Sequence, residues 1–286
     1  MTYLKLVCHK FKNIGGKYIM TLPFYFNEKV VNNRKKALSN MMQNCDKCNH
    51  SGYIETGDNM FVDCECVKEF ENVRKYLNFG LCENDIVTED RLSIFTEPVL
   101  EKIRQMVSKI ESYIGYSFFF YNLSKSAYGS DILAKYVYMK MCDVVPSCFT
   151  ISMKQLIDIF FDFEDEKYAG CLEFLKSVRV LLITGMGAEY NPKMKTDDTF
   201  VVSSLSGFFS ERNNNTTIIS ASFTKDTLYS TYSKELATLI AKDFLGFGVD
   251  SVKREETEYA IIRRKNLDIG FDDLSVVKPV RKKLLE

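Results

Sequence analysis

Four cysteines near the N-terminus have the spacing of a metal-binding site. Cys45 and Cys48 are separated by two residues, and fifteen residues further on Cys64 and Cys66 form a second pair separated by one. Zinc binds four thiolates at tetrahedral corners about 2.3 Å from the ion. Four unrelated reduced thiols, two disulfides and replacement of one cysteine by His50 remain open alternatives. We predict a zinc site, structural rather than catalytic because four thiolates leave no position for water.

The residues between the two cysteine pairs predict a zinc ribbon. Turn-forming residues occupy 49–53 and 56–59, and short β-prone pieces lie at 53–55 and 60–62. A ribbon of this size has little apolar core of its own. We therefore expect metal binding to be coupled to its folding.

The composition excludes several classes of protein. The 286 residues contain 38 basic and 38 acidic side chains, so no overall positive charge points to nucleic acid, and any such contact must be local. No apolar run is long enough to span a bilayer, and the start of the sequence lacks the features of a signal peptide. Nine cysteines in such a chain favour a reducing, cytoplasmic location. Five of them are expected to be small buried hydrophobes: Cys8, Cys82, Cys142, Cys148 and Cys171.

The rest of the chain alternates apolar strand-like runs with helical patterns. Strands are predicted at 116–121, 148–151, 178–183 and 216–220. Helices are predicted at 27–42, 67–81, 99–113, 131–142, 153–161, 169–177, 199–212 and 233–245. Residues 18–26 have a β-like pattern, and 259–262 are expected to be extended. This alternation predicts an α/β fold with a parallel, doubly wound sheet covered on both faces.

The same patterns predict a division of the chain. Residues 1–81 form an N-terminal zinc-binding, partner-binding domain, and the acidic, irregular segment 82–98 is a linker. Residues 99–248 form the α/β domain, and 249–286 a C-terminal extension with a polar, basic end.

A cysteine ribbon followed by this strand–loop–helix series resembles the DnaC/DnaI/IstB group of AAA+ proteins, the replicative helicase loaders and their phage relatives. In that group a strand runs into a phosphate-binding loop of the form G-x-x-x-x-G-K-[ST]. Here the strand 118–121 leads into a loop that reads from Ser124 to Asp131 and retains Gly129. The resemblance implies a P-loop NTPase (AAA+)-like sheet with helices on both faces.

The residues at the family's nucleotide-handling positions are largely different. Ser130 stands where the phosphate-binding lysine belongs, and Asp131 replaces the magnesium-binding hydroxyl. Thr184 and Gly185 end the strand that carries two aspartates in the family, and Ser222 stands at the polar sensor position. The degenerate nucleotide-binding set is therefore Ser124, Lys125, Gly129, Ser130, Asp131, Thr184, Gly185 and Ser222. We predict a pseudo-ATPase without catalytic residues and without bound ATP. An unrelated α/β domain, and an ATPase that uses Lys125, are the alternatives.

The resemblance implies a DNA replication factor of phage or mobile-element origin. It would bind a hexameric replicative helicase through residues 1–80 without hydrolysing ATP. The alternative is a nucleotide-dead loader mimic that acts as an inhibitor or adaptor of the helicase, whereas a transposition partner of the IstB kind is disfavoured. We leave open whether the chain contacts single-stranded DNA, for which Phe208, Phe209 and Arg212 are candidates. We also leave open whether it forms a homo-oligomer.

Overall fold

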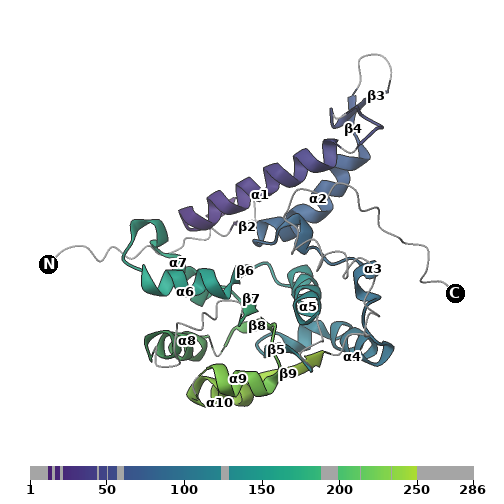
Figure 1. Cartoon of the computed structure of the whole chain (residues 1–286). Helices are drawn as coiled ribbons and strands as arrows, with labels where there is room; N and C mark the ends of the chain where they lie inside the picture. Colours follow the sequence, from purple (N-terminus) through teal and green to yellow (C-terminus); the bar gives the residue numbers. More distant parts are fainter. Residues whose placement is uncertain are drawn as a thin grey trace, which may run out of the picture.

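A five-stranded, all-parallel sheet forms the centre of the protein (Figure 1). The structure is a computed structural model that describes residues 12–14, 17–19, 22–43, 45–49, 51–56, 61–123, 129–187, 199–212, 214–232 and 234–249. The strands are β5 (Ser117–Asn122), β6 (Cys148–Ser152), β7 (Val180–Met186), β8 (Thr216–Ala221) and β9 (Phe244–Val249). Their order across the sheet is β6-β7-β8-β5-β9. The predicted parallel α/β class is confirmed.

Both faces of this sheet are buried, as expected for a parallel sheet with helices on either side. Successive side chains of a strand point to opposite faces. Accordingly, Phe118 and Phe120 of β5 belong to one apolar cluster and Phe119 to the other. All three rings are at most 3% exposed. The nearly continuous apolar runs seen in the sequence therefore reflect burial on two sides.

Helices divide between the two faces according to the apolar cluster that each one joins. One face is covered by α3 (Glu89–Leu92), α4 (Glu97–Val107), η2 (Ile110–Tyr113) and α5 (Ser130–Val144). The other is covered by α6 (Met153–Phe161), η3 (Glu166–Tyr168), α7 (Cys171–Ser177), α8 (Thr199–Glu211), α9 (Lys225–Thr231) and α10 (Lys234–Asp243). A capping box sets the start of α6: Ser152 Oγ accepts from the Gln155 N–H at 3.2 Å, and Gln155 Oε1 accepts from the Ser152 N–H at 3.3 Å.

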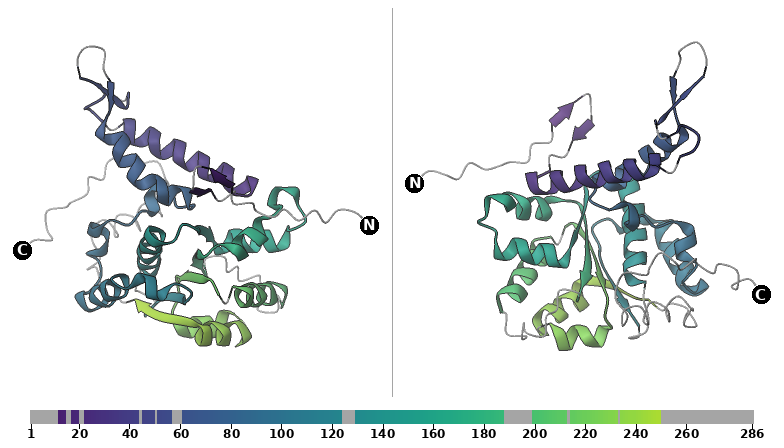
Figure 2. Two further views of the ribbon diagram at one scale, coloured as in Figure 1. Left: turned by 180° about the vertical axis from the view of Figure 1, so that it is seen from behind. Right: turned by 45° about the horizontal axis from the view of Figure 1, so that its top comes forward.

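The N-terminal part consists of two hairpins and two helices. The hairpins are β1 (Lys12–Ile14) with β2 (Lys17–Ile19) and β3 (Tyr53–Glu55) with β4 (Phe61–Asp63). The helices are α1 (Phe24–Gln43) and α2 (Glu65–Asn78), which pack against each other. The β3–β4 hairpin lies at the end of this helix pair that is farther from the sheet (Figures 1 and 2).

The first turn of α1 belongs to the core of the α/β sheet. Phe26 is 1% exposed, and its ring lies 4.7 Å from that of Phe149 and 5.7 Å from that of Phe174, measured between centroids. The β-like interpretation of residues 18–26 is therefore wrong at its C-terminal end, because α1 begins at Phe24. Burial of one helical face has overridden the β propensity of the aromatic residues there.

The segment predicted as a linker packs on the α/β core. It contains η1 (Glu83–Asp85) and α3, and Val87, Leu92 and Phe95 are buried. The Arg91 guanidinium donates to the carbonyls of Asn84 and Ile86 at 2.8 and 3.1 Å, which fixes the turn between these helices. The division into domains remains a prediction, but the described residues of 82–98 are not an extended tether.

The C-terminal helix ends earlier than the sequence pattern indicates. α10 stops at Asp243, and Phe244 begins β9, the edge strand beside β5. The strand predicted at 259–262 lies outside the described residues. Among the described helices, none is both long and apolar enough to cross a membrane.

Candidate metal centre and degenerate nucleotide site

The four cysteines converge on one point beside the β3–β4 hairpin. Cys45 and Cys48 lie in the turn after α1, Cys64 precedes α2, and Cys66 lies in its first turn. The Cys45 and Cys64 sulfurs are 3.6 Å apart, and those of Cys48 and Cys66 are 3.8 Å apart. All four lie within 4.8 Å of one another, so the sequence spacing predicted a real cluster.

These distances match a tetrahedral thiolate site. Four sulfurs at about 2.3 Å from a central ion are separated from one another by about 3.8 Å, the edge of the tetrahedron. A disulfide would require about 2.05 Å between two sulfurs. The side chains of Cys48, Cys64 and Cys66 are at most 6% exposed, so water has little access. This donor set can hold a metal ion and is compatible with zinc.

The thiols of Cys48 and Cys66 have opposite pKa shifts. The Gly52 N–H donates to Cys48 Sγ at 3.3 Å. Burial opposes ionisation of Cys48, but this bond and hydrogen bonds from neighbouring thiols outweigh it and lower the pKa of Cys48 to about 7. Burial and the same neighbours raise the pKa of Cys66 to about 12.

The described residues that the sequence predicts to form a degenerate nucleotide site lie near the carboxyl ends of β5, β7 and β8. Gly129 is the N-cap of α5, and Ser130 and Asp131 form its first turn. Thr184 and Gly185 lie in β7, and Ser222 follows β8. Ser124 and Lys125 lie outside the described residues. Ligands of open α/β sheets commonly bind at this edge, and the assignment of these residues to a degenerate nucleotide site stays a prediction.

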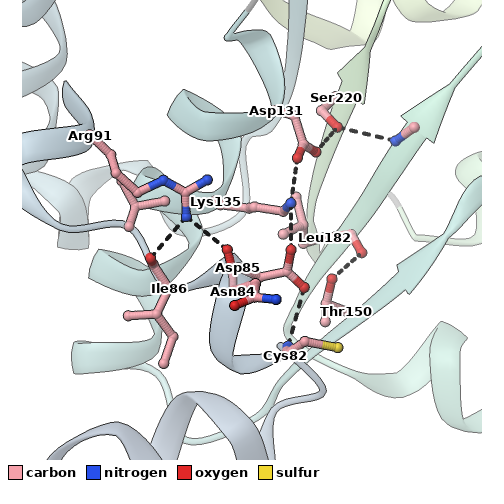
Figure 3. A network of polar contacts seen from close by, with 12 residues as sticks. Cys82, Asn84, Asp85, Ile86, Arg91, Asp131, Lys135, Thr150, Leu182 and Ser220 are labelled. Carbon is pink, nitrogen blue, oxygen red and sulfur yellow. Dashed lines mark hydrogen bonds and ion pairs between the residues drawn. The ribbon is translucent and has the colours of Figure 1, made fainter. Parts of the chain in front are cut away.

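A chain of polar contacts occupies the positions at the start of α5 (Figure 3). Asp131 accepts a hydrogen bond from Ser220 Oγ at 2.8 Å and forms an ion pair with Lys135, one turn later in the helix. Lys135 also contacts Asp85 at 2.7 Å, and Ser220 Oγ accepts from the Gly185 N–H at 3.2 Å. The Asp131 carboxylate is thus neutralised by this chain's own lysine.

The pKa of Lys135 reflects this arrangement. Burial would lower the pKa of the ammonium group, whose side chain is 13% exposed. The carboxylates of Asp131 and Asp85 outweigh burial and raise that pKa above its ordinary value of 10.5. Lys135 therefore carries its charge at neutral pH and links the segment before α3 to the start of α5.

Ser130 is directed into the protein rather than toward a ligand. Its side chain is 3% exposed, and its hydroxyl donates to the Ala221 carbonyl at 2.7 Å. Gly129 has φ +108°, and a Cβ there would lie 2.6 Å from the Phe95 ring. The start of α5 is therefore packed tightly against the segment that precedes α4.

Arg212 and its two neighbouring phenylalanines are structural. Phe208, Phe209 and Arg212 are at most 4% exposed. The Arg212 guanidinium donates to the carbonyls of Leu175, Lys176, Val178 and Thr216 and to Thr217 Oγ. Burial lowers the pKa of Arg212 to about 9. The suggestion that these three residues contact single-stranded DNA is therefore wrong.

The sequence interpretation missed the partners of its own candidate residues. Lys135 follows Asp131 by four positions, a spacing that brings side chains together on a helix and could have signalled the ion pair. Nothing in the local sequence indicated Asp85, Ser220 or Phe95, because these residues reach the site from distant segments.

No family model matches the sequence, and no curated protein is significantly similar to it. Several solved structures are similar to part of this chain, all at TM-scores below 0.5. The DnaC helicase loader is 16% identical, with 54% of this chain and 89% of that chain covered and a TM-score of 0.43. Domain III of the Thermotoga maritima replication initiation protein DnaA is 17% identical, with 62% and 71% covered and a TM-score of 0.41. DnaI is 16% identical, with 61% and 92% covered and a TM-score of 0.40.

The predicted α/β class is confirmed: the chain has a five-stranded parallel sheet with helices on both faces, preceded by a region with a four-cysteine cluster.

Proposed function

We propose that this chain is a helicase-loader-like DNA replication factor that binds a hexameric replicative helicase without hydrolysing ATP. The metal is zinc, held by the four cysteines, and the region around the β3–β4 hairpin makes the contact. The single observation that supports the pseudo-ATPase part most directly is the ion pair between Asp131 and Lys135 at the start of α5.

Two features of that site oppose nucleotide binding. The Asp131 carboxylate is already engaged by Lys135 and Ser220, and it would have to give up these contacts to hold the magnesium ion of a nucleotide. The residue at the phosphate-binding lysine position, Ser130, is buried and donates its hydroxyl to Ala221. Binding a nucleotide here would require breaking internal contacts without gaining the usual lysine or magnesium ligands.

The β3–β4 hairpin offers the surface for helicase binding. Its described residues include two exposed apolar side chains, Tyr53 at 57% and Val62 at 47%, which the strand register places on opposite faces of the hairpin. The cysteine cluster at its base fixes the hairpin rigidly on α2, and exposed apolar residues on a rigid element are suited to protein contact. The hairpin lies within residues 1–80, the part of the chain through which the sequence resemblance implies helicase binding.

Native mass spectrometry of the full chain with a hexameric replicative helicase tests this proposal. We expect a defined complex whose yield is the same with and without ATP and magnesium. Tyr53→Ser combined with Val62→Ser should remove the complex, whereas Tyr116→Ser, a control on the α/β body that is 55% exposed, should retain it. Absence of a complex with the wild-type chain, or ATP-dependent formation, would refute the proposal.

A second assay is needed to decide whether the chain loads the helicase onto DNA or inhibits its loading. A loader increases the amount of helicase deposited on single-stranded DNA, whereas a loader mimic that inhibits the helicase decreases it. Measuring helicase bound to a circular single strand, with and without the chain, separates these alternatives. The Tyr53→Ser, Val62→Ser variant is the matched control for both outcomes.

A further inference from the structure

A second surface lies on the α/β body, between α6, α7 and α8. Figure 1 shows these three helices beside one another on the face of the sheet that they cover. Between them is an open groove of about 330 Å³. Its apolar lining is formed by Phe160, Phe163, Leu172, Phe200 and Phe208.

Phenylalanines at the edge of this groove are unusually exposed. Phe163 is 58% exposed, and Phe161 and Phe200 are each 47% exposed. The Phe161 and Phe200 rings contact each other, with centroids 5.4 Å apart, so the aromatic edge is continuous from α6 to α8. Clustered exposed rings beside a groove mark a site of contact, whereas single exposed apolar residues do not.

The charge around the groove is negative. Asp162 and Glu164 lie in the loop after α6, and Glu166 begins η3. All three are exposed and have no ion-pair partner among the described residues. The nearby Lys176 is already paired, with Glu173 at 3.2 Å and Glu211 at 2.8 Å.

Lys167 of η3 points toward α1 rather than toward the three carboxylates. The Lys167 ammonium lies 4.8 Å from the Tyr168 ring centroid and 5.3 Å from that of Tyr25, on the side of α1. Three carboxylates therefore remain available beside the exposed phenylalanines, and they favour a positively charged ligand.

We propose that this groove binds a basic amphipathic helix of a partner protein. Large apolar side chains of one face of that helix enter the groove among Phe163, Leu172 and Phe200. Its lysines or arginines meet the carboxylates of the loop after α6. A groove of this size lies near the lower end of the range for ligand sites, roughly 300–1,000 Å³, and suits a few anchoring side chains. The site is separate from the β3–β4 hairpin and does not depend on helicase binding.

Fluorescence anisotropy with the full chain tests this proposal. The probe is a labelled synthetic helix of leucine and lysine, with the leucines on one face. A helix in which glutamate replaces every lysine is the matched control probe. We expect the lysine probe to bind, the glutamate probe not to bind, and added salt to weaken binding.

Variants of the chain identify the surface. Phe163→Ser with Phe200→Ser should weaken binding at least about tenfold. Asp162→Asn, Glu164→Gln and Glu166→Gln combined should weaken it about five- to tenfold, whereas Tyr116→Ser should leave it unchanged. All of these positions are exposed, so the fold should be retained.

Three outcomes would overturn the proposal. The lysine probe could bind the phenylalanine variant as tightly as the wild-type chain, or the glutamate probe could bind equally well. Alternatively, sedimentation could show that the chain alone self-associates and that Phe200→Ser abolishes the association. In that case a second copy of this chain, rather than a basic helix, occupies the groove.

Discussion

Replacing Phe26 by alanine tests whether α1 is part of the α/β core. The Phe26 side chain is 1% exposed, and its ring contacts those of Phe149 and Phe174 across the face of the sheet. Truncating a phenylalanine that is buried to this extent removes its apolar contacts and leaves a cavity, which costs about 3–5 kcal/mol of unfolding free energy. For a chain of this size, that corresponds to a decrease in melting temperature of about 6–20 °C.

Phe24 provides a control two residues away in the same helix. Its side chain is 79% exposed, so Phe24→Ala should change the unfolding free energy by no more than about 0.5 kcal/mol. The measurement is urea unfolding of the zinc-loaded full chain, followed by circular dichroism. If Phe26→Ala costs less than about 1 kcal/mol, or if only a separate early transition shifts, α1 is not part of the core and the reasoning fails.

Three further predictions concern the metal site, the ion-pair chain and the buried arginine. The purified chain should contain one zinc per molecule by elemental analysis, and Cys48→Ser should reduce its zinc affinity because one of four thiolates is lost. Lys135→Met should cost about 1–2 kcal/mol at pH 7 by urea unfolding, a value discounted because Asp131 is partly exposed. Arg212→Met should cost about 3–5 kcal/mol, since buried carbonyls lose their donor, whereas Arg179→Met, at an exposed position, should be nearly neutral.

The pH dependence of the Lys135 variant has a definite sign. The folded-state pKa of Lys135 is raised, so its stabilising contribution is fully present below 10.5 and is lost as pH rises through the higher folded value. The difference in stability between wild type and Lys135→Met should therefore be constant from neutral pH to about pH 10 and shrink above it. A difference that shrinks below pH 9 would contradict this account. An unchanged zinc affinity in Cys48→Ser would contradict the prediction for the metal site. Equal costs for the two arginine variants would contradict the prediction for Arg212.

The sequence by itself determined the elements whose signals are local. The two cysteine pairs predicted the sulfur cluster, because chelation by a short loop depends on spacing within that loop. The apolar runs predicted β5, β6, β7 and β8 and their parallel class, because strands buried on both faces must be apolar throughout. The described candidate nucleotide residues lie at or near the carboxyl ends of these strands, and their role stays a prediction.

Only the tertiary structure decided what surrounds those residues. Phe26 belongs to the sheet's core because Phe149 and Phe174 meet it there, and its local sequence looked β-like. Arg212 resembled a surface residue until its carbonyl partners from α7 and β8 were placed around it. Asp131 accepts a hydrogen bond from Ser220 and is neutralised by Lys135. Lys135 also binds Asp85, which lies 50 positions away in the sequence. Periodicity and spacing report on neighbours within a turn or a strand, whereas burial and charge compensation depend on segments that only folding brings together.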